Sequence, residues 1–225
     1  NHRLHPSVQA AKALIQAAAR AGASACKFQK RDNATLYTQA LLNAPYDNEM
    51  SFGPTYGAHR EALEFGAEAY QKVRVCAAVN NIPWFATAFD ETSADFLDRL
   101  DVPAFKIASG GVTDVSLLRH VAGFGRPVIL STGGCVLSDI DRAVEVLGDC
   151  PHALLHCTAS YPLVAAEANL RCIETLRARY PSTVIGWSSH APGIALSLVA
   201  YTLGARIIEH HATLNRAARG TDHAF

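Results

Sequence analysis

Two lysines lie in apolar stretches of the sequence where a charged side chain is unusual. Lys27 falls in the stretch 24–29, and Lys106 lies between Phe105 and Ile107. A buried ammonium group is costly unless it meets an anion, and lysine is a common point-charge partner of phosphate. Hydroxyl side chains at the ends of other apolar stretches would add directed donors, and these are Thr87, Ser109, Ser131, Thr132 and Ser188. The residue types therefore predict a site for a phosphate or carboxylate group.

Each of these hydroxyls also has an ordinary structural explanation. Ser and Thr at strand ends commonly cap the helix that follows, so either role is open for any single one. The glycines that follow Ser109 and Thr132 would let the backbone approach an anion closely. Lys106 has no comparable structural explanation, so we interpret it as functional.

The chain contains ten histidines, and two of them occupy corresponding positions. His190 and His211 close neighbouring predicted strands and could share one metal ion. Two imidazoles leave an open, water-rich site, which suits an activating Mn²⁺ or Mg²⁺-like ion better than structural zinc. The alternative is that each imidazole is simply hydrogen-bonded. Most other histidines are expected at the surface, among them His5, His59, His120 and His152.

Short apolar runs alternate along the chain with segments of helical spacing. The predicted strands are 24–29, 82–87, 104–109, 127–132, 153–158, 184–188 and 206–211. The predicted helices are 8–21, 58–79, 92–100, 115–122, 138–147, 169–179 and 193–203. Such a pattern indicates parallel strands covered by helices.

We expect an α/β fold, a TIM (β/α)8 barrel that lacks its first strand and last helix within this chain. The chemistry of such barrels lies at the carboxyl ends of the strands. An open doubly wound sheet is the alternative, but no Gly-x-Gly-x-x-Gly follows any predicted strand.

The composition is that of an ordinary globular protein with 225 residues, 20 basic and 20 acidic. A neutral chain has no electrostatic surface for nucleic acid, and no apolar run approaches the roughly 20 residues of a membrane span. No linker-like stretch divides residues 1–225, so we expect one domain. Six cysteines without a Cys-x-x-Cys pair indicate reduced, mostly buried thiols and a cytoplasmic location.

Several segments, taken in order, resemble the N-acetylneuraminate (sialic acid) synthases and the related spore-coat polysaccharide synthases. They cover nearly the whole chain, from Asn1-His2 through KFQK at 27–30, TYGAHREALEF at 55–65, PAFKIASGG at 103–111, PVILSTGG at 127–134, LLHCTASYPL at 154–163, NLRCIETL at 169–176, IGWSSHAPGIALS at 185–197, IIEHHATL at 207–214 and RGTDH at 219–223.

The resemblance implies a transferase that condenses phosphoenolpyruvate with an N-acetylmannosamine-type open-chain aldose and uses a divalent metal, Mn²⁺ or Mg²⁺. By resemblance, the phosphoenolpyruvate ligands are Lys27, Thr87, Lys106, Ser109, Ser131 and Ser188. The implied metal ligands are His190 and His211, and Gln29, Tyr161 and Asp222 would face the acceptor sugar. Strand alternation favours His211 over His210 as the inward-facing residue, together with Glu209 and Ile207. A homodimer of the full-length protein is also implied.

Some positions depart from the family pattern. Gly111 stands where an acidic residue near the sugar is usual, and the other departures are Ser189, His210, Ala212 and Asn215. The family's first strand, with its glutamate, would precede residue 1, and a small C-terminal antifreeze-like domain would follow Phe225. Two alternatives therefore stay open. One is a catalytically impaired barrel that binds a sugar or anion. The other is a related phosphoenolpyruvate aldolase with a different aldose, which would need a second basic cluster that we do not find in the sequence.

Overall fold

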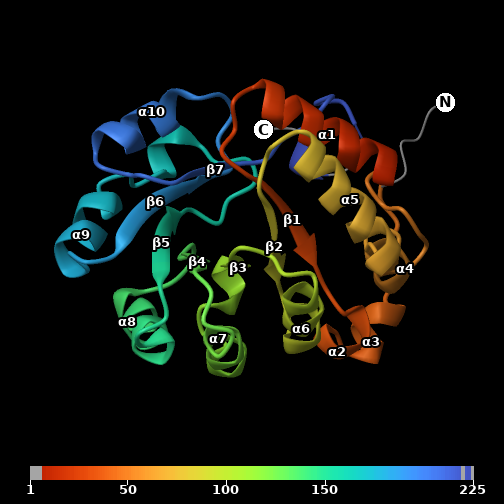
Figure 1. Ribbon diagram of the computed structural model, residues 1–225, viewed down its shortest axis with the longest axis horizontal. Helices are drawn as coiled ribbons and strands as arrows, with labels where there is room; N and C mark the ends of the chain where they lie inside the picture. Colours follow the sequence, from red (N-terminus) through yellow and green to blue (C-terminus); the bar gives the residue numbers. More distant parts are fainter. Residues whose placement is uncertain (1–6, 219–220, 224–225) are drawn as a thin grey trace. The chain divides into compact units, whose positions relative to one another are not determined.

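The computed structural model describes residues 7–218 and 221–223, and these form two compact units. The first unit contains residues 7–103 with 212–218 and 221–223, and the second contains residues 104–211. His5, the Asn1-His2 pair and the first two residues of RGTDH lie outside the described residues. Along the described chain, strands alternate with helices as the sequence predicts (Figure 1).

The first unit is built on two parallel strands covered by helices. Strands β1 (Cys26–Lys30) and β2 (Trp84–Ala88) pair so that Gln29 lies opposite Thr87. The main helices are α1 (Val8–Arg20), α5 (Ala67–Val79) and α6 (Glu91–Arg99). Ile15 of α1 and Val73 of α5 are fully buried. This packing fixes β1 and β2 against their helices and brings their carboxyl ends together.

The segment between β1 and α5 differs from the prediction. It contains three short helices, α2 (Asn33–Leu36), α3 (Gln39–Asn43) and α4 (Tyr56–Glu61). The prediction of one helix over 58–79 is wrong, because the N–H groups of Leu63 and Glu64 bond only three residues back and Gly66 starts α5 as its N-cap. The interruption places the Glu64 carboxylate 3.0 Å from the ammonium of Lys30.

The segment also buries a histidine that we expected at the surface. His59 is 8% exposed, its ring lies 4.7 Å from that of Tyr46, and its Nδ1 accepts a hydrogen bond from the Phe52 N–H at 3.1 Å. Two residues that are far apart in the segment, Pro45 and Thr55, form an isolated β-bridge that closes the loop. The histidine is therefore part of a small aromatic core that the sequence pattern does not reveal.

The second unit contains five parallel strands, each paired with the next along the chain. They are β3 (Phe105–Ile107), β4 (Val128–Ser131), β5 (His152–Cys157), β6 (Val184–Ser189) and β7 (Ile208–His210). The intervening helices are α7 (Val115–Ala122), α8 (Leu137–Leu147), α9 (Cys172–Arg179) and α10 (Ala195–Thr202). Short 3₁₀ turns are η1 (Ser109–Gly111) and η2 (Ala165–Glu167), and η3 (Thr221–His223) belongs to the first unit.

A charged contact joins α8 to the end of α9. The Arg179 guanidinium donates to Asp141 through Nε at 2.7 Å, and the Tyr180 hydroxyl donates to Asp141 Oδ1 at 2.6 Å. The hydrogen bond from Arg179, and after it the one from Tyr180, lowers the pKa of the Asp141 carboxyl to about 2. The carboxylate form is therefore the one that this contact favours.

The cysteines and the surface charges agree only partly with expectation. All six cysteines are free thiols, but only Cys76 and Cys157 are buried, so the prediction that most are buried is wrong.

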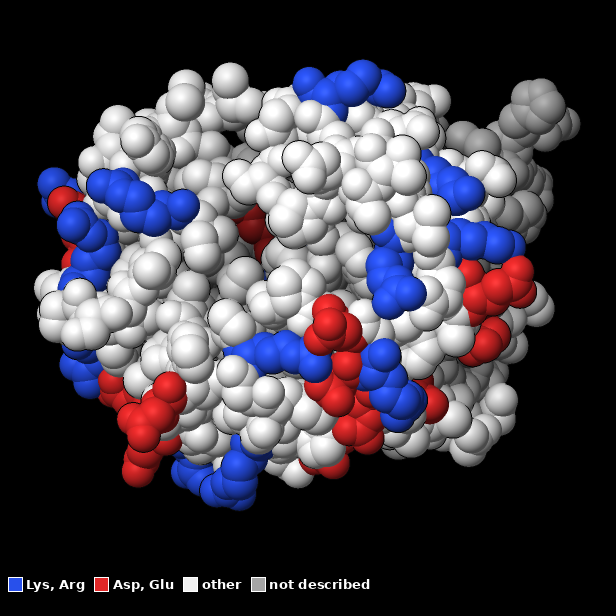
Figure 2. Space-filling view, in the orientation of Figure 1, with Lys and Arg blue, Asp and Glu red and all other residues white. Residues whose placement is uncertain are grey.

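On the face shown in Figure 2, basic and acidic side chains are interspersed, in keeping with the balanced composition. Among the described residues, no helix is long and apolar enough to cross a membrane.

Candidate functional site

Two predicted site residues of the first unit, one on each of its strands, are hydrogen-bonded to each other. The Lys27 ammonium donates to Thr87 Oγ1 at 3.3 Å, and Thr87 is 1% exposed. Thr87 does not cap the following helix, because Asp90 does so by accepting from the Ser93 N–H at 2.7 Å. Helix capping therefore does not explain the Thr87 hydroxyl. Instead, this hydroxyl lies beside the ammonium group of Lys27.

Two further residues predicted to face the acceptor also belong to the first unit. Gln29 is exposed near the carboxyl end of β1, and its Oε1 accepts a hydrogen bond from Arg31 at 2.8 Å. Asp222 is exposed in η3. Both side chains are accessible to a ligand.

Lys106 is buried in the second unit, as the sequence predicts. It is 2% exposed, and its ammonium donates to the Ile107 carbonyl at 2.9 Å and to Ser131 Oγ at 2.6 Å. Ser131 is also buried and caps no helix. The arrangement holds a positive charge and a hydroxyl together at the ends of β3 and β4.

The turn after β3 adds a hydroxyl and a close backbone contact. The Gly133 N–H donates to Ser109 Oγ at 2.8 Å. A Cβ on Gly133 would lie 3.0 Å from that oxygen and 3.2 Å from Cys157 Sγ, so glycine permits this approach. The Thr132 hydroxyl has a structural role instead, because it donates to the Leu155 carbonyl of β5 at 3.1 Å.

Cys157, the last residue of β5, is a site neighbour that we treated only as a small apolar residue. Its sulfur lies 3.9 Å from Nδ1 of His190. Burial raises the pKa of the Cys157 thiol, while a hydrogen bond with Ser109 and the charge of Lys106 act in the opposite direction. Its position at a strand end was the signal that could have identified it. The preceding residue, His156, points elsewhere and bonds to the Ala168 carbonyl at 2.8 Å.

The two histidines predicted to share a metal ion are neighbours. Their ring centroids are 5.4 Å apart, and Nδ1 of His190 lies 3.3 Å from the Thr158 carbonyl oxygen. His210 lies on the other side of the strand, where its Nε2 is 2.5 Å from Ser197 Oγ of α10. Strand alternation therefore separates His210 from His211 as predicted.

Two more side chains of the second unit complete the surroundings of His190 and Ser188. The Tyr161 ring centroid lies 4.0 Å from that of His190, and Tyr161 is 58% exposed. Ser188 Oγ donates to Glu209 Oε1 at 3.0 Å. The alternation of the last strand pointed to Glu209 as an inward residue, but we did not assign it a place in the site.

Gly111 lies in a tight position at the end of η1. A Cβ there would be 2.8 Å from Ile107 Cγ2 and 3.8 Å from Leu117 Cδ2, and both of these side chains are buried. The acidic residue that the family pattern places here cannot be added without moving the core. Position 111 therefore supplies no carboxylate in this chain.

Two arginines belong to the irregular segment between β1 and α5. Arg31 follows β1 directly and donates to Gln29, and burial, and after it the charge of Arg60 of α4, lowers the pKa of Arg31. Sequence spacing alone could not predict an electrostatic effect between residues that are 29 positions apart in an irregular segment.

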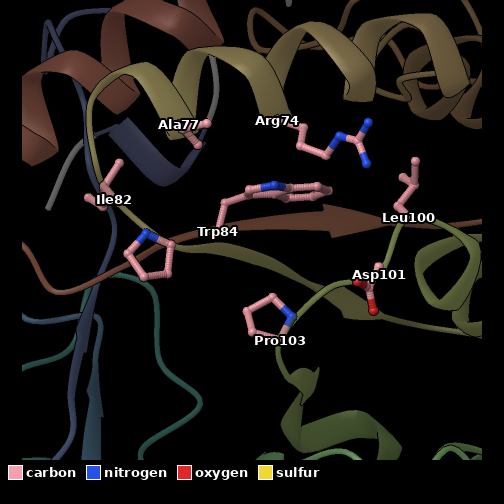
Figure 3. Close-up of a pocket in the computed structure, with 9 residues that line it drawn as sticks. Arg74, Ala77, Ile82, Trp84, Leu100, Asp101 and Pro103 are labelled. Atoms are coloured by element: carbon pink, nitrogen blue, oxygen red, sulfur yellow. The ribbon is translucent and has the colours of Figure 1, made fainter.

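A cavity of about 290 Å³ lies in the first unit at the opposite ends of the strands. Figure 3 shows the Trp84 indole between α5, which carries Arg74, and the segment with Leu100 and Asp101. Trp84 begins β2, so this is the amino-terminal side of the sheet. None of the predicted site residues lines the cavity, and we assign it no part in catalysis.

Comparison with known proteins gives one consistent result. A profile described as the NeuB family matches residues 14–225. The chain is 37% identical over 219 residues to N-acetylneuraminate-9-phosphate synthase of Drosophila melanogaster, covering 96% of this chain and 59% of that protein. The chain therefore spans about three-fifths of the length of this curated relative.

Two solved structures share the fold. The N-acetylneuraminic acid synthetase of Leptospira borgpetersenii, solved with citrate, superposes with a TM-score of 0.86 at 33% identity, covering 98% of this chain and 73% of that one. The spore coat polysaccharide biosynthesis protein SpsE of Bacillus subtilis gives a TM-score of 0.84 at 34% identity, covering 98% and 60%. The prediction of a (β/α)8-type barrel fold is confirmed, and the described residues contain seven of its strands.

Proposed function

This chain belongs to the NeuB family, and from that premise we propose that residues 1–225 form the barrel domain of a nonulosonic acid synthase. The enzyme would condense phosphoenolpyruvate with N-acetylmannosamine or a related open-chain aldose and release phosphate. The observation that carries the proposal is the buried Lys106–Ser131 pair, because a desolvated ammonium with a hydroxyl beside it suits a phosphate or carboxylate.

The proposed reaction is a condensation that forms one carbon–carbon bond and releases phosphate. C3 of phosphoenolpyruvate attacks the aldehyde carbon, so the enol π electrons form the new carbon–carbon bond and C2 becomes oxocarbenium-like. Water adds at C2, one of its protons ends on the former aldehyde oxygen, which becomes a hydroxyl, and the C2–O bond to phosphate breaks as the C2 hydroxyl loses its proton to form the ketone. A 2-keto acid and inorganic phosphate result. Lys106 and the hydroxyls of Ser109, Ser131 and Ser188 would stabilise the charge on the phosphate and carboxylate throughout, as preorganised donors.

The first unit would contribute further ligands. Lys27 and Thr87, which are already hydrogen-bonded to each other, are proposed to bind phosphoenolpyruvate. Gln29 and Asp222, and Tyr161 of the second unit, are proposed to bind the acceptor. All three are exposed, which suits contact with a diffusing sugar.

His190 and His211 fit a divalent ion such as Mn²⁺ or Mg²⁺. Their rings are adjacent, and the contact of His190 Nδ1 with a carbonyl oxygen favours the tautomer with its lone pair on Nε2. Among the described residues, no group of three His, Cys, Asp or Glu side chains is arranged to hold a metal. The protein would therefore supply the two imidazoles as ligands. A bound ion would polarise the aldehyde oxygen of the acceptor.

We also propose that the full-length protein is a cytoplasmic homodimer that binds no nucleic acid. The free thiols and the balanced charge support the location and the absence of nucleic-acid binding.

A crystal of the protein soaked in Mn²⁺ tests the metal assignment through its anomalous scattering. The expected peak lies between His190 and His211. A peak elsewhere, or ligation through His210, would overturn the assignment.

A further inference from the structure

The thiol of Cys157 lies beside two kinds of proposed site residue at the end of β5. Cys157 is 6% exposed, and its register partner on β6 is Ser188. Its sulfur lies 3.9 Å from Nδ1 of His190, a proposed metal ligand. These residues all belong to the second unit, so their contacts lie within one compact part of the chain.

On one side, the sulfur borders the same space as the hydroxyl of Ser109. A Cβ on Gly133 would lie 3.2 Å from Cys157 Sγ and 3.0 Å from Ser109 Oγ, so both atoms face the room that this glycine leaves. Ser109 Oγ accepts the Gly133 N–H at 2.8 Å, and its own proton is then available for the sulfur. Burial raises the pKa of the Cys157 thiol, and a hydrogen bond with Ser109 acts in the opposite direction, as a hydroxyl that donates to sulfur would.

On the other side, two consecutive residues of the chain contact one nitrogen of His190. Nδ1 lies 3.3 Å from the carbonyl oxygen of Thr158 and 3.9 Å from the sulfur of Cys157. The Tyr161 ring packs against the imidazole with the ring centroids 4.0 Å apart. An imidazole that is fixed through Nδ1 presents Nε2 to a metal ion, and groups around the non-ligating nitrogen tune the affinity of such a ligand.

We propose that Cys157 is a positioning residue that fixes Ser109 for phosphoenolpyruvate and His190 for the metal ion. The inference rests on the proposed function, because it takes Ser109 and His190 as ligands. Alanine at position 157 would remove this neighbour from both side chains. Serine would restore a polar atom for Ser109, but its carbon–oxygen bond is shorter than a carbon–sulfur bond and draws that atom back from Nδ1.

The test measures two dissociation constants of the natural full-length protein by isothermal titration, that of Mn²⁺ without substrate and that of phosphoenolpyruvate without metal. Cys157→Ala should raise both constants at least about fivefold. Cys157→Ser should return the phosphoenolpyruvate constant to within about twofold of the parent value and leave the Mn²⁺ constant raised. Cys76→Ala is the matched control and should change neither constant, because Cys76 is also buried but lies on α5, where its thiol donates to the Lys12 carbonyl.

Thermal unfolding without ligands separates positioning from packing, since both alanine variants remove a buried sulfur. Their melting temperatures should fall by similar amounts. A lowered melting temperature in Cys157→Ala with both constants unchanged would refute the positioning role, and so would a Mn²⁺ constant in Cys157→Ser equal to that of the parent. If Cys157→Ala does not fold, the serine variant decides through its Mn²⁺ constant.

Failure of the proposed function has a different signature. A parent protein that binds both ligands but releases no phosphate with any acceptor would refute the synthase, and the two constants would still test the positioning role. A parent that binds neither Mn²⁺ nor phosphoenolpyruvate would refute both.

Discussion

Replacement of Lys106 by methionine separates the functional account of this residue from a structural one. Methionine keeps much of the length and apolar volume of lysine and removes the charge. The ammonium is almost completely buried and donates to the Ile107 carbonyl and to Ser131 Oγ. If Lys106 binds phosphoenolpyruvate as proposed, its removal would leave the bound substrate without this buried cation.

The magnitude follows from the burial. Removing one member of a buried, hydrogen-bonded charge pair typically costs about 2–5 kcal/mol of binding free energy. We expect the affinity for phosphoenolpyruvate to fall by about 2–4 kcal/mol, which is roughly 30- to 900-fold in Kd. Without ligand, a desolvated ammonium destabilises the fold. The melting temperature of the unliganded variant should therefore stay the same or rise.

Isothermal titration with phosphoenolpyruvate and thermal unfolding with and without it measure both quantities. Lys72→Met is the matched control, because Lys72 is exposed and its ammonium pairs with Glu68 one helical turn away. The control should bind phosphoenolpyruvate as the parent does. Unchanged affinity in Lys106→Met, together with a lowered melting temperature, would show that the lysine serves the fold.

Three further outcomes follow from the structure. Gly111→Ala should destabilise the fold by about 1–3 kcal/mol through overpacking, whereas Gly110→Ala, with no atom within 4 Å of the added Cβ, should be neutral; equal melting temperatures would contradict the packing. Asp141→Asn should lower the melting temperature at pH 7 by a few degrees at most, as expected for an exposed pair. Because the folded pKa of Asp141 lies below its unfolded value, this stabilisation is complete above about pH 4 and lost as pH falls toward 2, and a difference that persists at pH 1.5 would refute this origin. His211→Gln should abolish activation by Mn²⁺ whereas His210→Gln should leave it nearly unchanged, as measured by titration of activity with the metal, and the reverse order would refute the ligand assignment.

The regular part of the fold could be predicted because its signals are local. Strands β3 to β6 are short runs that the structure largely buries, and the buried lysine stands out because it interrupts β3. Strand alternation was sufficient to separate His211 from His210, since the two residues must point to opposite sides.

The irregular segment after β1 could not be predicted in the same way. His59 is buried by Tyr46 and Phe52, and Arg31 contacts Glu64, through a segment whose path depends on tertiary contacts. No periodicity marks these pairs. Likewise, the interruption near Glu64 lies in a stretch whose helical spacing continues across it, and the carboxylate is placed by Lys30 and Arg31.

The central claim is that the protein joins phosphoenolpyruvate to an aldose with cleavage of the C2–O bond. The direct test supplies the natural full-length protein with Mn²⁺, an aldose acceptor and phosphoenolpyruvate labelled with ¹⁸O in the bridging enol oxygen. The account predicts acceptor-dependent release of phosphate that carries the label, together with one new 2-keto sugar acid of the condensed mass. Phosphate release that needs no acceptor, or label retained in pyruvate or in the sugar acid, would contradict it.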